Sequence, residues 1–99
     1  MADVTILIVE DENIIALDLR ARLIGLGYRV LGMVACGEEA LRLVAQQRPA
    51  IVLMDIVLKG NLDGVQTAQL IHDRFHIPVV YLSAYSDETT LARARVTEP

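Results

Sequence analysis

The chain of 99 residues has few of the residue types that mark several functional classes. Its one cysteine, Cys36, has no partner for an internal disulfide, which fits a reducing compartment and predicts a cytoplasmic protein. No uninterrupted apolar run approaches the roughly 18 residues of a membrane helix, and the N-terminal residues show no signal-peptide pattern. Lys59 is the only lysine, and the net charge is -4. Since nucleic-acid-binding domains need clustered cations, no direct contact with nucleic acid is expected.

Apolar residues are abundant instead. Hydrophobic residues make up 54% of the chain, and the mean hydropathy is +0.42. A chain of this length forms one domain and must bury roughly two-thirds of its unfolded surface, which such a composition allows. We therefore predict a single domain over residues 1–99.

Short apolar runs alternate with amphipathic stretches along this domain. The expected strands are Thr5 to Val9, Tyr28 to Val34, Ala50 to Met54 and Ile77 to Leu82. The expected helices are Asn13 to Leu26, Gly37 to Gln47, Val65 to Phe75 and Asp87 to Val96. In the first helix, one stripe is formed by Ile14, Leu17, Ala21 and Ile24. Four strands that alternate with helices predict an α/β fold with a parallel sheet covered on both faces.

Acidic residues follow two of these strands directly. Glu10 and Asp11 come after the first strand, Asp55 comes after the third, and Ser83 follows the fourth. Ligands of open α/β sheets bind beyond the carboxyl ends of the strands. If the first and third strands are neighbours, three carboxylates converge there, and their repulsion favours a bound cation. All-oxygen ligands suit Mg²⁺ or Mn²⁺, and such a site suits phosphoryl chemistry. The alternative is that these acids are only solvated strand ends.

The motifs together resemble a response-regulator receiver domain of two-component signalling. They are Leu7-Ile-Val-Glu-Asp-Glu12, Ile51-Val-Leu-Met-Asp55-Ile-Val-Leu, Asp63-Gly64 and Ile77-Pro-Val-Val-Tyr-Leu-Ser83-Ala84. The resemblance runs over essentially the whole chain. It implies a flavodoxin-like, doubly wound parallel sheet with strand order 2-1-3-4, in which the family's fifth strand and helix are absent. The loop from Leu58 to Gly64 resembles that of receivers found beside sensory or kinase modules.

The resemblance also implies a role for each site residue. Asp55 matches the phosphoacceptor, which takes a phosphoryl group from a sensor histidine kinase. Asp11 matches the direct ligand of Mg²⁺, and Glu10 matches its partner, which acts through water. Asp55 and the main-chain carbonyl of Val57 are expected to complete the protein ligands. Ser83 matches the hydroxyl that contacts the phosphoryl group and switches the loop after the fourth strand.

The chain departs from the family pattern at its C-terminal end. The family has a fifth strand with a lysine at its tip, whereas Lys59 lies in the loop before the third helix and is expected to be a solvated charge. Without a fifth strand and helix, Val and Ile side chains of strands one, three and four would be exposed, and strand four would be an open edge. We expect either a dimer through this edge or a fragment of a longer protein with an output or sensory domain outside the chain, and we favour the fragment.

Three other functions are open to a sheet of this kind. An aspartate-based phosphatase needs a second acid two residues after the nucleophile, where this chain has Val57. A flavin-binding domain needs a phosphate loop after the first strand, where the acids would repel a phosphate. A pseudo-receiver would bind partners without phosphorylation. His72 and His76 are expected at the surface or at a helix cap rather than on a metal.

Overall fold

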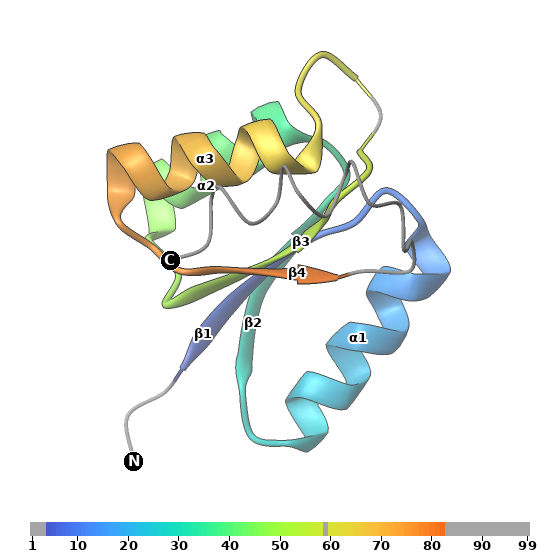
Figure 1. Cartoon of the computed structure of the whole chain (residues 1–99). Helices are drawn as coiled ribbons and strands as arrows, with labels where there is room; N and C mark the ends of the chain where they lie inside the picture. The colour runs from blue at the N-terminus through green and yellow to red at the C-terminus, as the bar shows by residue number, and fades with distance from the viewer. Residues whose placement is uncertain (1–3, 59, 83–99) are drawn as a thin grey trace.

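The computed structural model describes residues 4–58 and 60–82. Its seven elements, in chain order, are β1 (Thr5–Val9), α1 (Asn13–Gly25), β2 (Arg29–Val34), α2 (Gly37–Gln47), β3 (Ile51–Asp55), α3 (Gly64–Phe75) and β4 (Val79–Leu82). The strands form one parallel sheet in the order β2-β1-β3-β4, as Figure 1 shows. This confirms the predicted α/β fold and strand order, and the predicted bounds agree within two residues. The predicted fourth helix, Asp87 to Val96, lies outside the described residues.

The sheet separates two apolar layers, with α1 on one face and α2 and α3 on the other (Figure 1). Side chains alternate between these faces because successive residues of a strand point in opposite directions. In β1, Ile6 and Ile8 pack on the α1 side, whereas Leu7 and Val9 pack on the α2 and α3 side. The central strands β1 and β3 therefore carry apolar residues on both faces, as expected of a covered parallel sheet.

The orientation of α1 differs from the prediction. The expected stripe is exposed: Ile14 is 84% exposed, and Leu17 and Ile24 are each about half exposed. The helix instead turns Ala16, Leu19 and Leu23 toward the sheet, where they pack with Ile6 and Ile8. The sequence did not distinguish the two stripes, because apolar residues lie almost all round this helix and both sets have helical spacing. Ala16 is small, so α1 can approach the sheet closely along that side.

The two stripes of α1 can be distinguished by a matched pair of leucine substitutions. We expect Leu19→Ala to lower the free energy of unfolding by about 2 kcal/mol, because it removes apolar contacts with the sheet. Leu17→Ala, on the exposed side of the same helix, should change it by less than about 0.5 kcal/mol. Urea titration of both variants measures the difference. Equal losses would contradict the observed rotation of α1.

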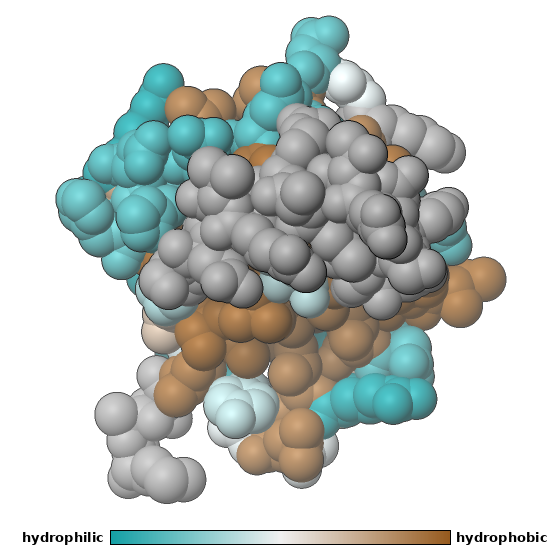
Figure 2. All heavy atoms as spheres, viewed as in Figure 1, coloured by the Kyte–Doolittle hydropathy of each residue, from teal (hydrophilic) through white to brown (hydrophobic). Residues whose placement is uncertain are grey.

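The edge of the sheet at β4 is partly apolar. Val80 is half exposed, as expected for strand four, whereas Ile6 and Ile8 of β1 are buried. The prediction of an exposed face is therefore confirmed at Val80 and wrong at β1, because α1 covers that strand. In Figure 2 apolar residues gather in the lower part of the view, beside some hydrophilic ones, on the side where α1 lies in Figure 1. No helix within the described ranges has the length and apolar character required to cross a membrane.

Candidate functional site

Three carboxylates meet at the carboxyl edge of the sheet. The parallel register of β1 and β3 pairs Val9 with Met54, so the next residues, Glu10 and Asp55, come out at neighbouring positions. Asp11 follows Glu10 in the turn that leads to α1. One oxygen from each of Glu10, Asp11 and Asp55 lies within 4.8 Å of the other two. The predicted convergence of these acids is therefore confirmed.

Glu10 is the most buried member of this acidic cluster. It is 8% exposed, and its backbone N–H donates to the carbonyl of Val34 on β2. Burial, followed by a side-chain hydrogen bond and charge repulsion with Asp55, raises the pKa of Glu10 to about 7 from 4.5. The backbone N–H of Glu12 donates to the Glu10 carboxylate at 3.2 Å, and this hydrogen bond lowers the pKa of Glu10. The cluster thus holds a carboxyl group whose ionised form lacks compensating charge, as expected where a cation is to bind.

Asp55 ends β3 and is only partly buried. One of its carboxylate oxygens accepts a hydrogen bond from the backbone N–H of Val57, 3.2 Å away. This bond fixes the carboxylate against its own loop. None of the ion pairs found within residues 4–58 and 60–82 involves the three acids. Ser83 and Lys59 lie outside the described residues.

The loop after Asp55 is held by the first turn of α3. Asp63 caps this helix: its carboxylate accepts from the backbone N–H of Gln66 at 2.8 Å, and its own N–H donates to the Gln66 side chain at 3.0 Å. This reciprocal pair satisfies two backbone donors at the start of the helix. The N–H of Gly64 donates to the carbonyl of Ile56, which directly follows Asp55. The start of α3 is therefore attached to the backbone beside the candidate phosphoacceptor.

Two glycines and a buried threonine complete this support. A side chain on Gly64 would overlap the Asp55 carbonyl oxygen, and one on Gly37 would overlap the Thr67 hydroxyl. Thr67 is fully buried and donates its hydroxyl to the carbonyl of Asp63 at 2.8 Å. Asp63-Gly64 contributed to the motif resemblance, but the capping of α3 by Asp63 and the close approach of Gly64 to Asp55 were not predicted from the sequence. The spacing of Asp63 and Gln66, an acid followed three residues later by Gln, is the signal that was available.

Comparison with known proteins identifies the family and its fold. A family model described as the response regulator receiver domain matches residues 6–98. The chain belongs to this family. The resemblance in the motifs and the predicted strand order are thereby confirmed. Receiver domains are signalling modules of response regulators, and the acidic cluster occupies the sheet edge where ligands bind in this type of fold.

Individual relatives of this receiver domain are regulators. The chain is 36% identical over 83 residues to the phyllosphere-induced regulator PhyR of Methylorubrum extorquens, and 36% identical over 90 residues to the transcriptional regulatory protein PdtaR of Mycobacterium tuberculosis. These matches cover 83% and 91% of this chain, but only 31% and 43% of the two relatives. The chain thus spans less than half of the length of either regulator.

A solved structure agrees closely over nearly the whole chain. It is the signal receiver domain of a modulated diguanylate cyclase from Desulfovibrio desulfuricans, with 41% identity and a TM-score of 0.93. The match covers 97% of this chain and 76% of that one. A receiver domain of Erythrobacter litoralis PhyR is 33% identical with a TM-score of 0.78, over 86% of this chain and 66% of the other.

The residues present fit a hard divalent cation. Glu10, Asp11 and Asp55 offer oxygen only, and Mg²⁺ binds through one or two carboxylates while it retains several waters. The open, partly exposed positions of Asp11 and Asp55 leave room for those waters. The raised pKa of Glu10 is a second indication, because a cation would relieve the repulsion that contributes to it.

Proposed function

We propose that this receiver domain accepts a phosphoryl group on Asp55 from a sensor histidine kinase in a reaction that requires Mg²⁺. The observation that carries the proposal is the convergence of Glu10, Asp11 and Asp55 within 4.8 Å at the end of β1 and β3. An Asp55 oxygen would form a bond to phosphorus as the bond from phosphorus to the donor imidazole breaks, and the departing nitrogen would keep the electron pair. The product is an acyl phosphate.

Each neighbour of Asp55 has a defined part in this proposal. Asp11 and Asp55, with the carbonyl of Val57, would hold the metal directly, and Glu10 would do so through water. The bound ion supplies positive charge that offsets the charge of the transferring group. The hydrogen bond from the Val57 N–H keeps one Asp55 oxygen engaged, so the other is the attacking atom. Ser83 would donate its hydroxyl to the phosphoryl oxygens and draw the loop after β4 inward.

The partners follow from the same role. We propose that the domain is phosphorylated in the cytoplasm. A sensory or output domain outside these residues would then receive the signal. This agrees with the relatives, because PdtaR and PhyR are named as regulators and the Desulfovibrio structure as the receiver of a diguanylate cyclase. The half-exposed Val80 at the edge of the sheet is where we expect a second copy to pair, if the protein dimerises.

Phosphorylation at Asp55 is tested with a small phosphodonor, with and without Mg²⁺. We expect intact-mass spectrometry to show one added phosphoryl group in the presence of Mg²⁺ and none after chelation of the metal. Asp55→Asn should remove the modification, because an amide is not a nucleophile for phosphorus. Asp18→Asn, an exposed acid of α1 paired with Arg22, is the matched control and should be modified normally. Undiminished labelling of Asp55→Asn would overturn the assignment.

The alternative is a pseudo-receiver that binds proteins without being phosphorylated. The exposed side chains of Ile14, Leu17 and Ile24 on α1 favour a protein contact surface, which such a module would need. The same experiment separates the two functions. A folded wild-type chain that binds neither Mg²⁺ nor the phosphoryl mimic fluoroberyllate would favour the pseudo-receiver.

A further inference from the structure

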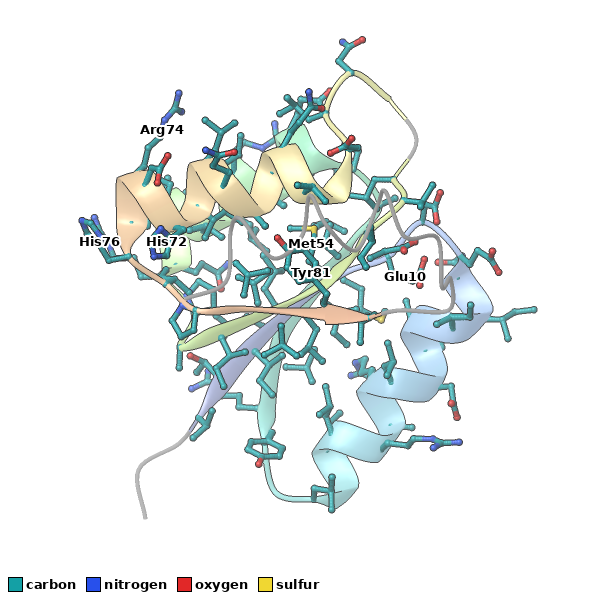
Figure 3. All side chains as sticks on the ribbon, viewed as in Figure 1. Glu10, Met54, His72, Arg74, His76 and Tyr81 are labelled. Carbon is teal, nitrogen blue, oxygen red and sulfur yellow. The ribbon has the colours of Figure 1, made fainter. Side chains whose placement is uncertain are left out.

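The carboxyl-terminal end of α3 carries a pair of histidines that the proposed function does not use. His72 lies in the last turn, and His76 is the residue that ends the helix. They are the only two histidines of the chain. Figure 3 shows both side chains together at one end of the molecule, while Glu10 lies at the other end. This separation is expected, because the acidic cluster lies at the carboxyl ends of the strands and α3 runs away from that edge.

The helix end brings the two imidazoles together. Residues four apart lie on the same face of a helix, and His76 caps α3 with its N–H donated to the carbonyl of His72 at 3.0 Å. The ring centroids of His72 and His76 are 6.4 Å apart, in an edge-to-face arrangement. Two imidazoles on one tetrahedral ion have centroids about 5 Å apart, since each metal–nitrogen bond is about 2 Å long. His72 and His76 are not buried, so side-chain rotation can close this difference.

The surroundings favour a cation between these rings. Asp73 lies 3.5 Å from Nδ1 of His72, in the position of the carboxylates that orient metal-bound histidines, and this leaves Nε2 of His72 available. The carbonyl end of a helix also carries partial negative charge. Arg74 opposes a cation, and Arg48 is engaged over the ring of Phe75, 5.5 Å from its centroid. The Asp73 carboxylate and the carbonyl end of the helix thus favour a cation beside His72.

We propose that His72 and His76 form a two-imidazole site for a borderline transition-metal ion such as Zn²⁺. Imidazole suits Zn²⁺, Ni²⁺ and Cu²⁺, whereas Mg²⁺ selects oxygen ligands. The two ends of this domain would thus prefer different classes of ion. With no further protein ligand, water molecules would fill the remaining coordination positions of Zn²⁺. The proposal does not depend on phosphorylation of Asp55.

Calorimetric titration with ZnCl₂ in excess Mg²⁺ tests the site, because Mg²⁺ then competes for the acidic cluster. We expect one equivalent of Zn²⁺ to bind the wild-type chain, and His72→Gln or His76→Gly to weaken binding by about tenfold or more. Proton NMR signals of the two imidazole rings should shift together with the first equivalent. His76 has φ of 56°, the left-handed conformation that glycine prefers, so His76→Gly should fold at least as stably as the wild type.

Two control variants define the outcomes that would overturn this site. Asp11→Asn, in the acidic cluster, should leave the Zn²⁺ affinity unchanged, and Asp73→Asn should reduce it. The proposal is wrong if His76→Gly binds Zn²⁺ as tightly as the wild type, or if Asp11→Asn abolishes binding. It is also wrong if the wild-type chain binds no Zn²⁺ below about 1 mM.

Discussion

Replacing Gly64 by alanine is expected to cost about 3 kcal/mol or more of unfolding free energy. The added methyl group would overlap the carbonyl oxygen of Asp55 and would lie 2.7 Å from that of Ile56. Both obstacles are backbone atoms, which cannot rotate away as a side chain can. Relief therefore requires either that α3 moves away from the sheet or that the end of β3 is displaced. Either movement changes the position of the Asp55 carboxylate, so the proposed phosphorylation should be lost as well.

Gly25→Ala is the matched control for this substitution. No atom lies within 4 Å of a methyl group at Gly25, which is the last residue of α1. Alanine is also a better helix former than glycine, so the change should be neutral or stabilising by up to about 1 kcal/mol. Chemical denaturation measures both effects, and phosphodonor labelling at a temperature where Gly64→Ala is still folded measures the effect on Asp55. A Gly64→Ala protein as stable as the wild type would show that the tight contact is not maintained.

The sequence was sufficient for most of the fold because its signals were strong and local. Alternating apolar runs and helical patterns, with Gly and Pro between them, are determined by short-range chemistry. The orientation of α1 was not predictable in the same way, because a helix with apolar residues on nearly every side offers two equivalent stripes. The choice between them depends on how the small Ala16 packs against Ile6 and Ile8 of β1, and this packing is not visible in the sequence of the helix.

The candidate site shows the same division. Glu10, Asp11 and Asp55 could be brought together from the sequence, since the ends of neighbouring parallel strands share one edge. The burial of Glu10 could not be predicted, because it depends on how the end of β1 packs beside β2. There the Glu10 N–H donates to the carbonyl of Val34. The close approach of Gly64 to Asp55 likewise depends on the path of the loop between β3 and α3.

The metal-free protein is expected to lose stability as the pH rises from about 5 to about 8. Glu10 has a pKa of about 7 in the folded chain, against 4.5 as the ordinary value. Between these two values the folded state binds more protons than the unfolded state, so the free energy of unfolding falls with increasing pH. The favourable contribution is complete below pH 4.5 and is lost as the pH passes through about 7. The loss should be on the order of 1 to 2 kcal/mol, because one pKa unit is worth about 1.4 kcal/mol and solvent at the edge of the sheet screens part of the shift.

Urea titrations across this pH range, in a chelating buffer, measure the effect and its origin. Glu10→Gln removes the ionisable proton but retains an acceptor for the Glu12 N–H, so its stability should vary less with pH and exceed that of the wild type near pH 8. Glu38→Gln, at an exposed acid of α2, should retain the wild-type slope. Saturating Mg²⁺ should restore the stability of the wild type at high pH, because a cation stabilises the ionised carboxylates, and should restore less in Glu10→Gln. A wild-type profile that is flat without metal would mean that Glu10 ionises normally and that the three acids do not repel one another.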